Sequence, residues 1–222
     1  MKKRLTLFTL VTLISLVLSQ SLFAQTDTLE VYPTLNDDVV YLNDVIENNA
    51  GYKVYKLMST DISYFYTKVT TLSTDFEIFG KVDPTTGRLP CIQPLELDDN
   101  SIADRVFNAT ADDITITFKN IYFLARSNAN TIAPPPTPNS GDPDPGVIST
   151  NGNNLTLNID NCVFDSWHHF SVYDNGSNNN FYFTNNIWRN FVQKGNHLWV
   201  GEVLRHLDPT TPMVMYLCRT IQ

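Results

Sequence analysis

The sequence is poor in cysteine, and its three cysteines, Cys91, Cys162 and Cys218, lie far apart. An odd number cannot be fully paired within one chain, which excludes a complete disulfide framework. Their spacing also matches no metal-binding arrangement of thiolates, so we predict no metal site there. We interpret the three residues as small apolar side chains of a core.

Basic residues are also scarce. The chain has 15 Lys and Arg against 23 Asp and Glu, a net charge of −8 at pH 7. Because Lys2, Lys3 and Arg4 lie at the very start, residues 25–222 alone hold 12 basic and 23 acidic residues, a net charge of −11. An acidic surface repels nucleic acid and anionic lipid headgroups. We therefore expect no nucleic acid and no membrane as partner, and polyanionic sugars only where a cation such as Ca²⁺ bridges them.

Long apolar runs are absent after residue 24. Residues 5–18 are apolar apart from Thr and Ser, follow the basic start, and lead to Ala24, a small residue suited to signal cleavage. This layout predicts a secretory signal peptide at residues 1–24. The alternative is a membrane anchor, but the 14 apolar residues fall short of the roughly 20 needed to span a bilayer. We expect a secreted, periplasmic or cell-surface protein of a bacterium.

Helical periodicity is confined to one short stretch. Leu42, Val45 and Ile46 share one face of a predicted helix over residues 42–50, which Gly51 ends. This helix belongs to a predicted N-terminal cap region, residues 25–51, of which residues 29–42 are expected to be irregular. A single domain then follows, residues 52–222, made of short strands. The strand signals lie at residues 52–58, 62–66, 76–79, 89–95, 106–107, 114–118, 121–124, 155–159, 162–164, 170–173, 181–183 and 187–188.

A segment rich in proline, residues 131–146, interrupts these strand signals. Proline excludes it from a strand or helix interior, so we predict an exposed inserted loop. Within it, Asp142 and Asp144 resemble a calcium loop only in part, because they lack the full alternating pattern of oxygen ligands. A solvated turn is the favoured interpretation, and Ca²⁺ is kept as an open possibility.

An internal repeat organises the strands. Three segments align without gaps: residues 116–123 (ITFKNIYF), 157–164 (LNIDNCVF) and 181–188 (FYFTNNIW). Each has an Asn at its fifth position and a large apolar residue at its eighth. The asparagines are Asn120, Asn161 and Asn185, and the apolar residues are Phe123, Phe164 and Trp188. The second and third asparagines are 24 residues apart and the first two 41, which leaves about 25 once the inserted loop is subtracted.

A period in this range, built from short strands, predicts a solenoid in which equivalent residues of successive coils stack. Asparagine suits a bend because it tolerates a left-handed backbone, and the three large apolar residues are expected to stack inside. We predict an all-β fold: a right-handed parallel β-helix of about five coils with a short N-terminal cap helix. An antiparallel sandwich also has many short strands, but it does not explain the repeated register.

With these repeats, and with residues 76–80 ending in Gly80, the sequence resembles the right-handed parallel β-helix superfamily, the pectate-lyase-like proteins. That resemblance implies an exported protein that meets polysaccharide. Lyases of the superfamily use Arg or Lys as a base and Asp residues to hold Ca²⁺. The matching residues here would be Arg126, Arg189 and Lys194, with Asp160, Asp165 and Asp174. Arg189 and Asp165 are the catalytic candidates, although none of these positions carries a family catalytic motif.

A hydrolase is less well supported by the repeat. Glycosidases need two carboxyl groups about 5–10 Å apart, which adjacent coils could supply. Asp160 instead aligns with Lys119 in the first repeat and Thr184 in the third. No acidic pair stacks at this position.

Aromatic and polar residues near the end of the chain are candidates for sugar binding. Trp167 and His168 follow the second repeat, where a loop is expected to face solvent. Trp199, Glu202 and Arg205 form a second group, in a segment that could be helical over residues 198–207. The competing interpretations are a lone histidine without a role and a C-terminal flank anchored by one Trp.

The last segment, residues 213–221, is an apolar strand candidate within an uncertain terminal coil, residues 191–222. A solenoid that stops there would leave an open edge, so we consider a chain shortened relative to a longer protein, and end-to-end self-association. Three functions remain open. We favour an exported module that contacts extracellular polysaccharide without catalysis. The alternatives are a polysaccharide lyase or glycoside hydrolase, a lyase being preferred if it is an enzyme, and a structural remnant without activity.

Overall fold

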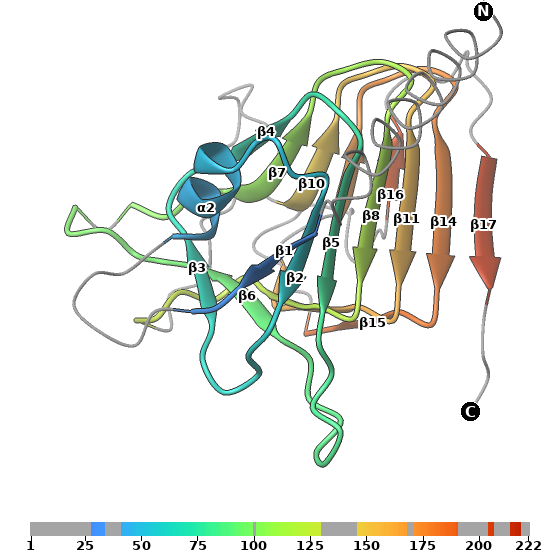
Figure 1. The fold of residues 1–222 in the computed structure, drawn as a ribbon. Helices are drawn as coiled ribbons and strands as arrows, with labels where there is room; N and C mark the ends of the chain where they lie inside the picture. The colour runs from blue at the N-terminus through green and yellow to red at the C-terminus, as the bar shows by residue number, and fades with distance from the viewer. Residues whose placement is uncertain are drawn as a thin grey trace, which may run out of the picture.

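The structure is a computed structural model, and it describes residues 28–33, 41–99, 101–129, 146–167 and 171–190, together with the backbone of residues 204–206 and 214–218 (Figure 1). The predicted signal peptide, Asp142, Asp144 and nearly all of the proline-rich insertion lie outside the described residues.

Three parallel sheets make up the fold. Sheet A contains β1 (Thr28–Val31), β2 (Val54–Leu57), β5 (Phe76–Gly80), β8 (Thr115–Lys119), β11 (Thr156–Asp160), β14 (Asn180–Thr184) and β17 (Val214–Cys218). Sheet B contains β3 (Tyr64–Tyr66), β6 (Cys91–Pro94), β9 (Tyr122–Leu124), β12 (Val163–Asp165) and β15 (Ile187–Arg189). Sheet C contains β4 (Thr70–Leu72), β7 (Arg105–Ala109), β10 (Gly146–Thr150), β13 (Val172–Asp174) and β16 (Leu204–His206).

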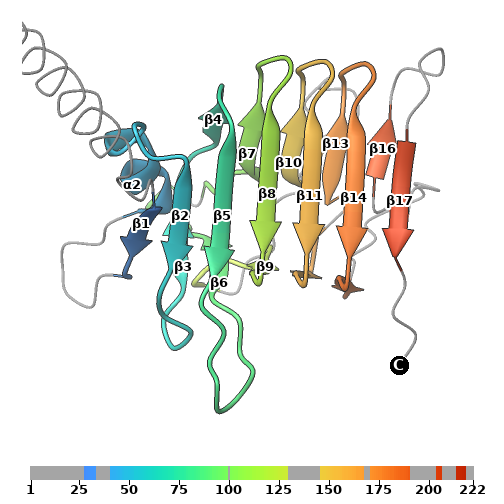
Figure 2. The same ribbon diagram turned by 45° about the vertical axis from the view of Figure 1, so that its right-hand side comes forward.

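The chain visits the sheets in the fixed order A, B, C, so each group of three consecutive strands is one coil. Within the described residues, five such coils run from β2 to β16; β1 precedes them and β17 follows them as the first and seventh strands of sheet A. Figure 2 shows sheet A running down the near side while the coils advance from left to right, which makes the solenoid right-handed, as parallel crossovers almost always are. The predicted fold class is confirmed.

The first coil is covered by the predicted helix. Helix α2 (Leu42–Asn48) packs against β3 and β4, with Leu42 and Ile46 buried. Its 7 residues make it too short to cross a bilayer, and no other described segment is a helix that could do so.

Four strands were not predicted: β1, β4, β10 and β16, the last of which lies in a segment considered as a helix. Residues 29–42 were expected to be irregular, yet residues 28–31 form β1, paired in parallel with β2 and joined to it by an ion pair of 2.8 Å between Glu30 Oε1 and Lys56 Nζ. Strands β4 and β10 were also missed, because β4 has only 3 residues and β10 begins at Gly146, the last residue of the predicted inserted loop. Their neighbours in sheet C supply the pairing.

The core is a column of aromatic rings along the solenoid axis. The rings of Phe123 and Phe164 lie 5.4 Å apart with planes 15° from parallel, and those of Phe164 and Trp188 lie 5.5 Å apart at 6°. This is the internal stack that the repeat predicted. Offset-stacked rings contribute beyond the apolar area that they bury.

The bend from sheet A to sheet B is the predicted asparagine position. Asn120, Asn161 and Asn185 have φ of 56°, 51° and 55°, the left-handed region that asparagine tolerates. Asn161 Nδ2 donates to Asn120 Oδ1 over 2.8 Å, whereas Asn185 Nδ2 donates to Asp160 Oδ1 over 3.2 Å. Gly80 occupies the same position one coil earlier, where a Cβ would come within 2.1 Å of the Asn120 carbonyl oxygen.

The left-handed bend can be tested with two substitutions that remove the same side chain. Asn161→Ala should lower the free energy of unfolding by about 1 kcal/mol more than Asn161→Gly, because only alanine meets the steric penalty of a positive φ. Chemical denaturation of the two variants measures this difference. Equal stabilities would show that the backbone at this bend is not left-handed.

A second test concerns Tyr66, whose ring is 1% exposed and whose hydroxyl has no hydrogen-bond partner among the described residues. A buried unpaired hydroxyl is destabilising. Tyr66→Phe should therefore raise the free energy of unfolding by about 1 kcal/mol. Tyr64→Phe is the control and should lower it, because the Tyr64 hydroxyl donates to the Val31 carbonyl and accepts from Met58 N. A destabilised Tyr66→Phe would reveal a partner such as a buried water.

Candidate functional site

The outer face of sheet B carries a polar cluster around the predicted catalytic pair. In β9, β12 and β15 the middle residue points inward and belongs to the aromatic column. The flanking residues therefore point outward. Register places Asp165 beside Arg189 on one neighbouring strand and beside Leu124 on the other. The structure thus brings together the two predicted residues, Arg189 and Asp165, at 2.8 Å.

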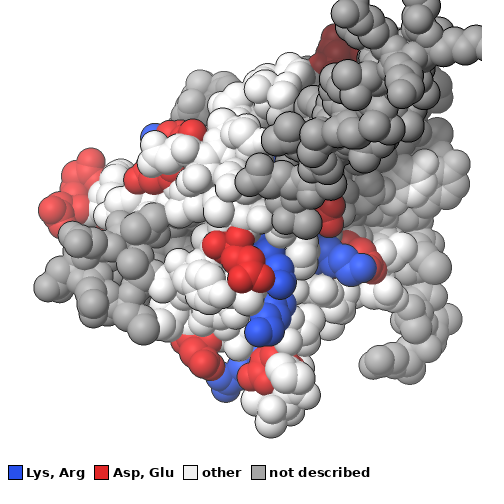
Figure 3. Space-filling model, in the orientation of Figure 1, with Lys and Arg blue, Asp and Glu red and all other residues white. Residues whose placement is uncertain are grey.

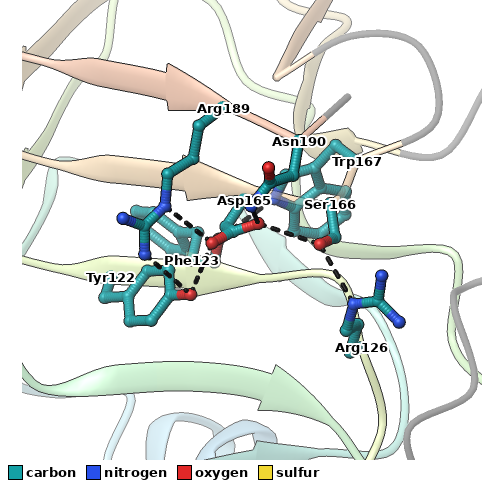
Figure 4. A network of polar contacts seen from close by, with 8 residues as sticks. All are labelled: Tyr122, Phe123, Arg126, Asp165, Ser166, Trp167, Arg189 and Asn190. Carbon is teal, nitrogen blue, oxygen red and sulfur yellow. Dashed lines mark hydrogen bonds and ion pairs between the residues drawn. The ribbon is translucent and has the colours of Figure 1, made fainter. Parts of the chain in front are cut away.

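The Asp165 carboxylate is the centre of this cluster. Its side chain is only 5% exposed, and it accepts four hydrogen bonds. Oδ2 accepts from the Tyr122 hydroxyl at 2.6 Å and from Arg189 Nε at 2.8 Å. Oδ1 accepts from the Ser166 hydroxyl at 2.8 Å and from Asn190 Nδ2 at 2.9 Å. Figure 4 shows the two pairs of donors on different sides of the carboxylate.

The direction of each proton in the cluster follows from two arginines, which can only donate. Arg189 donates from a terminal nitrogen to the Tyr122 hydroxyl oxygen at 3.3 Å, and Arg126 Nε donates to the Ser166 hydroxyl oxygen at 3.1 Å. Each hydroxyl therefore has its own proton left for Asp165. A carboxylate that accepts from four donors must be ionised.

The pKa values agree with this assignment. Burial alone would raise the pKa of Asp165, but the hydrogen bonds from Tyr122, Asn190, Ser166 and Arg189 hold it below its usual range. Burial and the bond to Asp165 raise the pKa of Tyr122. Bonds to Tyr122 and Asp165 raise the pKa of Arg189. At neutral pH all three groups keep one protonation state, which suits holding a charge better than transferring a proton.

Next to this cluster lies a hollow of about 400 Å³. Its apolar wall includes Leu89, Cys91, Tyr122 and Val163, and both charged residues of its lining are arginines, Arg88 and Arg189. The lining holds no acidic residue, but the Asp165 carboxylate next to it pairs with Arg189, so Arg88, Arg189 and Asp165 together leave one net positive charge at the hollow. On the face shown in Figure 3, by contrast, basic side chains lie next to acidic ones in small mixed groups.

Each arginine is supported by neighbouring structure, Arg88 by a hydrogen-bonded turn and Arg189 by an aromatic ring. Arg88 belongs to a turn in which the Asp83 carboxylate accepts from the backbone N–H of Thr85 and Thr86 at 2.7 and 3.1 Å. The guanidinium of Arg189 lies 5.4 Å from the centre of the Tyr122 ring, a cation–π distance. The Arg189 side chain is 53% exposed, and its three remaining N–H groups have no partner among the described residues.

Trp167 is not the exposed sugar platform that the sequence suggested. It is 0% exposed, and its indole Nε1 donates to the Phe123 carbonyl at 3.2 Å. The left-handed backbone of Ser166, φ 64°, bends the chain so that the Trp167 ring belongs to the core instead of a solvent-facing loop.

The remaining sugar-binding candidates are placed only in part. His168, Trp199 and Glu202 lie outside the described residues. Arg205 lies in β16, which pairs with β13, so the helix considered over residues 198–207 is wrong at residues 204–206. The pairing partner in sheet C decides the conformation there.

Two of the acidic residues that the resemblance assigned to Ca²⁺, Asp174 and Asp160, instead form hydrogen bonds and an ion pair within the protein. Asp174 is fully buried and accepts from Thr150 Oγ1 and Asn179 Nδ2, each at 2.7 Å. Asp160 lies 3.7 Å from Lys119 Nζ and aligns with Lys119 and Thr184, as the repeat predicted. Lys194 lies outside the described residues. Across the described ranges, no three His, Cys, Asp or Glu side chains are grouped as metal ligands.

Of the cysteines, Cys162 is fully buried, as predicted, and Cys91 is half-buried in the wall of the hollow. Burial raises the pKa of Cys162 to about 12 and that of Cys91 to about 11. Neither thiol is a reactive thiolate at neutral pH.

Sequence reasoning missed Tyr122, Ser166, Asn190 and Arg88. The first three could have been found, because the aligned repeats place residues 122 and 189–190 on the coils that flank residues 165–166. Arg88 comes from a loop outside the repeat, and no local pattern points to it.

Comparison with protein-family models gave no match, and neither a curated protein nor a solved structure matched the chain. The class of protein is therefore defined by the fold itself, an all-parallel β-solenoid.

The cluster can be tested through Asp165. Asp165→Asn should lower the free energy of unfolding at pH 7 by about 2–4 kcal/mol, because an amide cannot replace a carboxylate that is paired with arginine and accepts four bonds. A group with a lowered folded pKa stabilises above its unfolded pKa, near 4, and loses that contribution as pH falls through the folded value. The difference from wild type should therefore be full above about pH 5 and shrink in stronger acid.

Denaturation curves between pH 2 and pH 7 measure this difference. Asp160→Asn is the comparison variant. Asp160 pairs with Lys119 and accepts from Thr184 Oγ1 at 2.7 Å and from Asn185 Nδ2 at 3.2 Å, but its side chain is 35% exposed, so the substitution should cost only about 1 kcal/mol. A difference for Asp165→Asn that stays constant over the whole range would contradict an ionised buried carboxylate.

Proposed function

We propose that this chain is an exported β-helix module that contacts extracellular polysaccharide through the outer face of sheet B, without catalysis. The observation that carries the proposal is the hollow beside Tyr122, in which Arg88 and Arg189 are the two charged residues of an otherwise uncharged lining. Export is supported by the layout of residues 1–24. The resemblance of the repeats to pectate-lyase-like proteins supports a polysaccharide partner.

The sheet offers a linear ligand a continuous row of side chains. Tyr122, Val163 and Ile187 are register partners on three successive coils, about 4.8 Å apart as strands in a sheet are. All three point outward, and Ile187 is 54% exposed. An apolar row with polar margins suits the face of a sugar ring, and a chain lying along the solenoid axis would meet one coil after another.

The arginines favour a sugar that carries a carboxylate. A guanidinium matches a carboxylate with two parallel hydrogen bonds, and Arg189 keeps three N–H groups without a described partner. The chain as a whole, at −8, repels polyanions. Arg88 and Arg189 therefore give an acidic sugar a place at which approach is favourable, with the attraction weakened by salt.

A polysaccharide lyase is the second candidate, because Arg189 lies against Asp165 and lyases of the resembling superfamily use an arginine base. Such a base must lose a proton. Hydrogen bonds to Tyr122 and Asp165 raise the pKa of Arg189, which opposes that step. Binding is therefore the better supported function.

Binding can be measured by affinity electrophoresis of the purified chain through polygalacturonate and alginate as uronate polymers, and through a neutral xylan. Wild type should be retarded by a uronate polymer and not by the neutral one. Arg88→Gln should raise the dissociation constant roughly tenfold or more, the loss of about one charge-assisted hydrogen bond. Lys68→Gln removes the same charge from the segment between β3 and β4, where Lys68 pairs with Glu47 of α2, and should bind like wild type.

Equal retardation of Arg88→Gln and Lys68→Gln would show that the polymer does not bind at the hollow. Retardation by the neutral polymer alone would remove the role of the arginines. New chain ends in the incubated polymer would make the protein a lyase or hydrolase.

A further inference from the structure

One residue of the cluster has an unusual backbone. Eight described residues other than glycine have positive φ, and seven of them are Asn or Asp. The exception is Ser166, at φ 64°. Asparagine and aspartate are enriched in the left-handed region and serine is not, so serine at this position requires a physical reason.

The bend itself does not require serine. Asn190 is the register equivalent of Ser166 one coil later, since Asp165 pairs with Arg189, and it has φ 54°. Asparagine therefore adopts the same left-handed conformation at the equivalent bend one coil later. What distinguishes the two positions is the environment of their side chains.

The Ser166 hydroxyl joins two charged groups through a single atom. Residue 166 is 2% exposed. Its Oγ accepts from Arg126 Nε at 3.1 Å and donates to Asp165 Oδ1 at 2.8 Å. A hydroxyl can accept and donate at one oxygen, whereas an amide divides these functions between two atoms. Asparagine or glycine would relieve the backbone but lose this link.

The link fixes the carboxylate that orients Arg189. With Ser166 and Asn190 on Oδ1, the other oxygen is left to Tyr122 and Arg189 (Figure 4). We propose that Ser166 is a positioning residue for ligand binding: it holds Asp165 in the orientation that directs the Arg189 guanidinium at the hollow. This inference rests on the proposed function for its ligand, but the ordering of Arg189 is a property of the protein alone.

The test is Ser166→Gly, which removes the hydroxyl and suits a positive φ. Its thermal midpoint should stay near that of wild type, because relief of the backbone offsets the lost hydrogen bonds. Its dissociation constant for the uronate polymer that retards wild type should nevertheless rise roughly fivefold or more. Asn178→Gly is the matched control, a left-handed and exposed residue at another bend, φ 59°, and should bind like wild type.

A second measurement needs no ligand. In the NMR spectrum of the arginine Nε–H groups, the Arg189 signal should be protected from solvent exchange in wild type and in Asn178→Gly, and should lose that protection in Ser166→Gly. The positioning role would be overturned if the Arg189 signal of Ser166→Gly stayed protected. It would also be overturned if wild type bound a uronate polymer and Ser166→Gly bound it with the same affinity. If wild type binds no uronate polymer, the proposed function is wrong, and the Arg189 signal still decides whether Ser166 orders the arginine.

Discussion

Register between parallel strands of successive coils is the constraint on which the rest of this structure depends. Each of β8, β11 and β14 pairs residue for residue with its neighbour, so a side chain in one coil lies against its equivalent in the next. The Asn120–Asn161 hydrogen bond, the column of Phe123, Phe164 and Trp188, and the Asp165–Arg189 pair all result from this one rule. A slip of one residue would exchange the inner and outer rows and destroy all three.

The repeat made the inner features predictable, because asparagine at a bend and a large apolar residue three positions on are local signals that recur. Features that depend on distant partners were not predictable in this way. Strand β1 is recognised only through its pairing with β2. The burial of Trp167 was not predicted, because serine at position 166 gives no sequence signal of a left-handed bend. The pair Arg189 and Asp165 was selected through a resemblance, and only the three-dimensional register shows that the two residues meet and that four donors surround the carboxylate.

Charge is distributed in this protein by the same geometry. Burying a carboxylate is costly unless partners replace the water it loses, and Asp165 has such partners from its own coil and from both neighbouring coils. Tyr122 belongs to the coil before it and Arg189 to the coil after it. The carboxylate therefore links three coils by hydrogen bonds on the outer face of sheet B. Phe123, Phe164 and Trp188 link the same three coils by ring stacking on the inner face.

The proposed binding site lies at β9, β12 and β15, where these inner and outer contacts coincide. A guanidinium on a mobile side chain loses conformational entropy when it captures a ligand. Arg189 has already lost much of that freedom, since Nε is bonded to Asp165 and the guanidinium lies against the Tyr122 ring. The strands that hold these residues are in turn fixed by the aromatic column one residue away. The packing of the solenoid and the ordering of Arg189 beside the hollow thus depend on the same three short strands, with the left-handed Ser166 next to them.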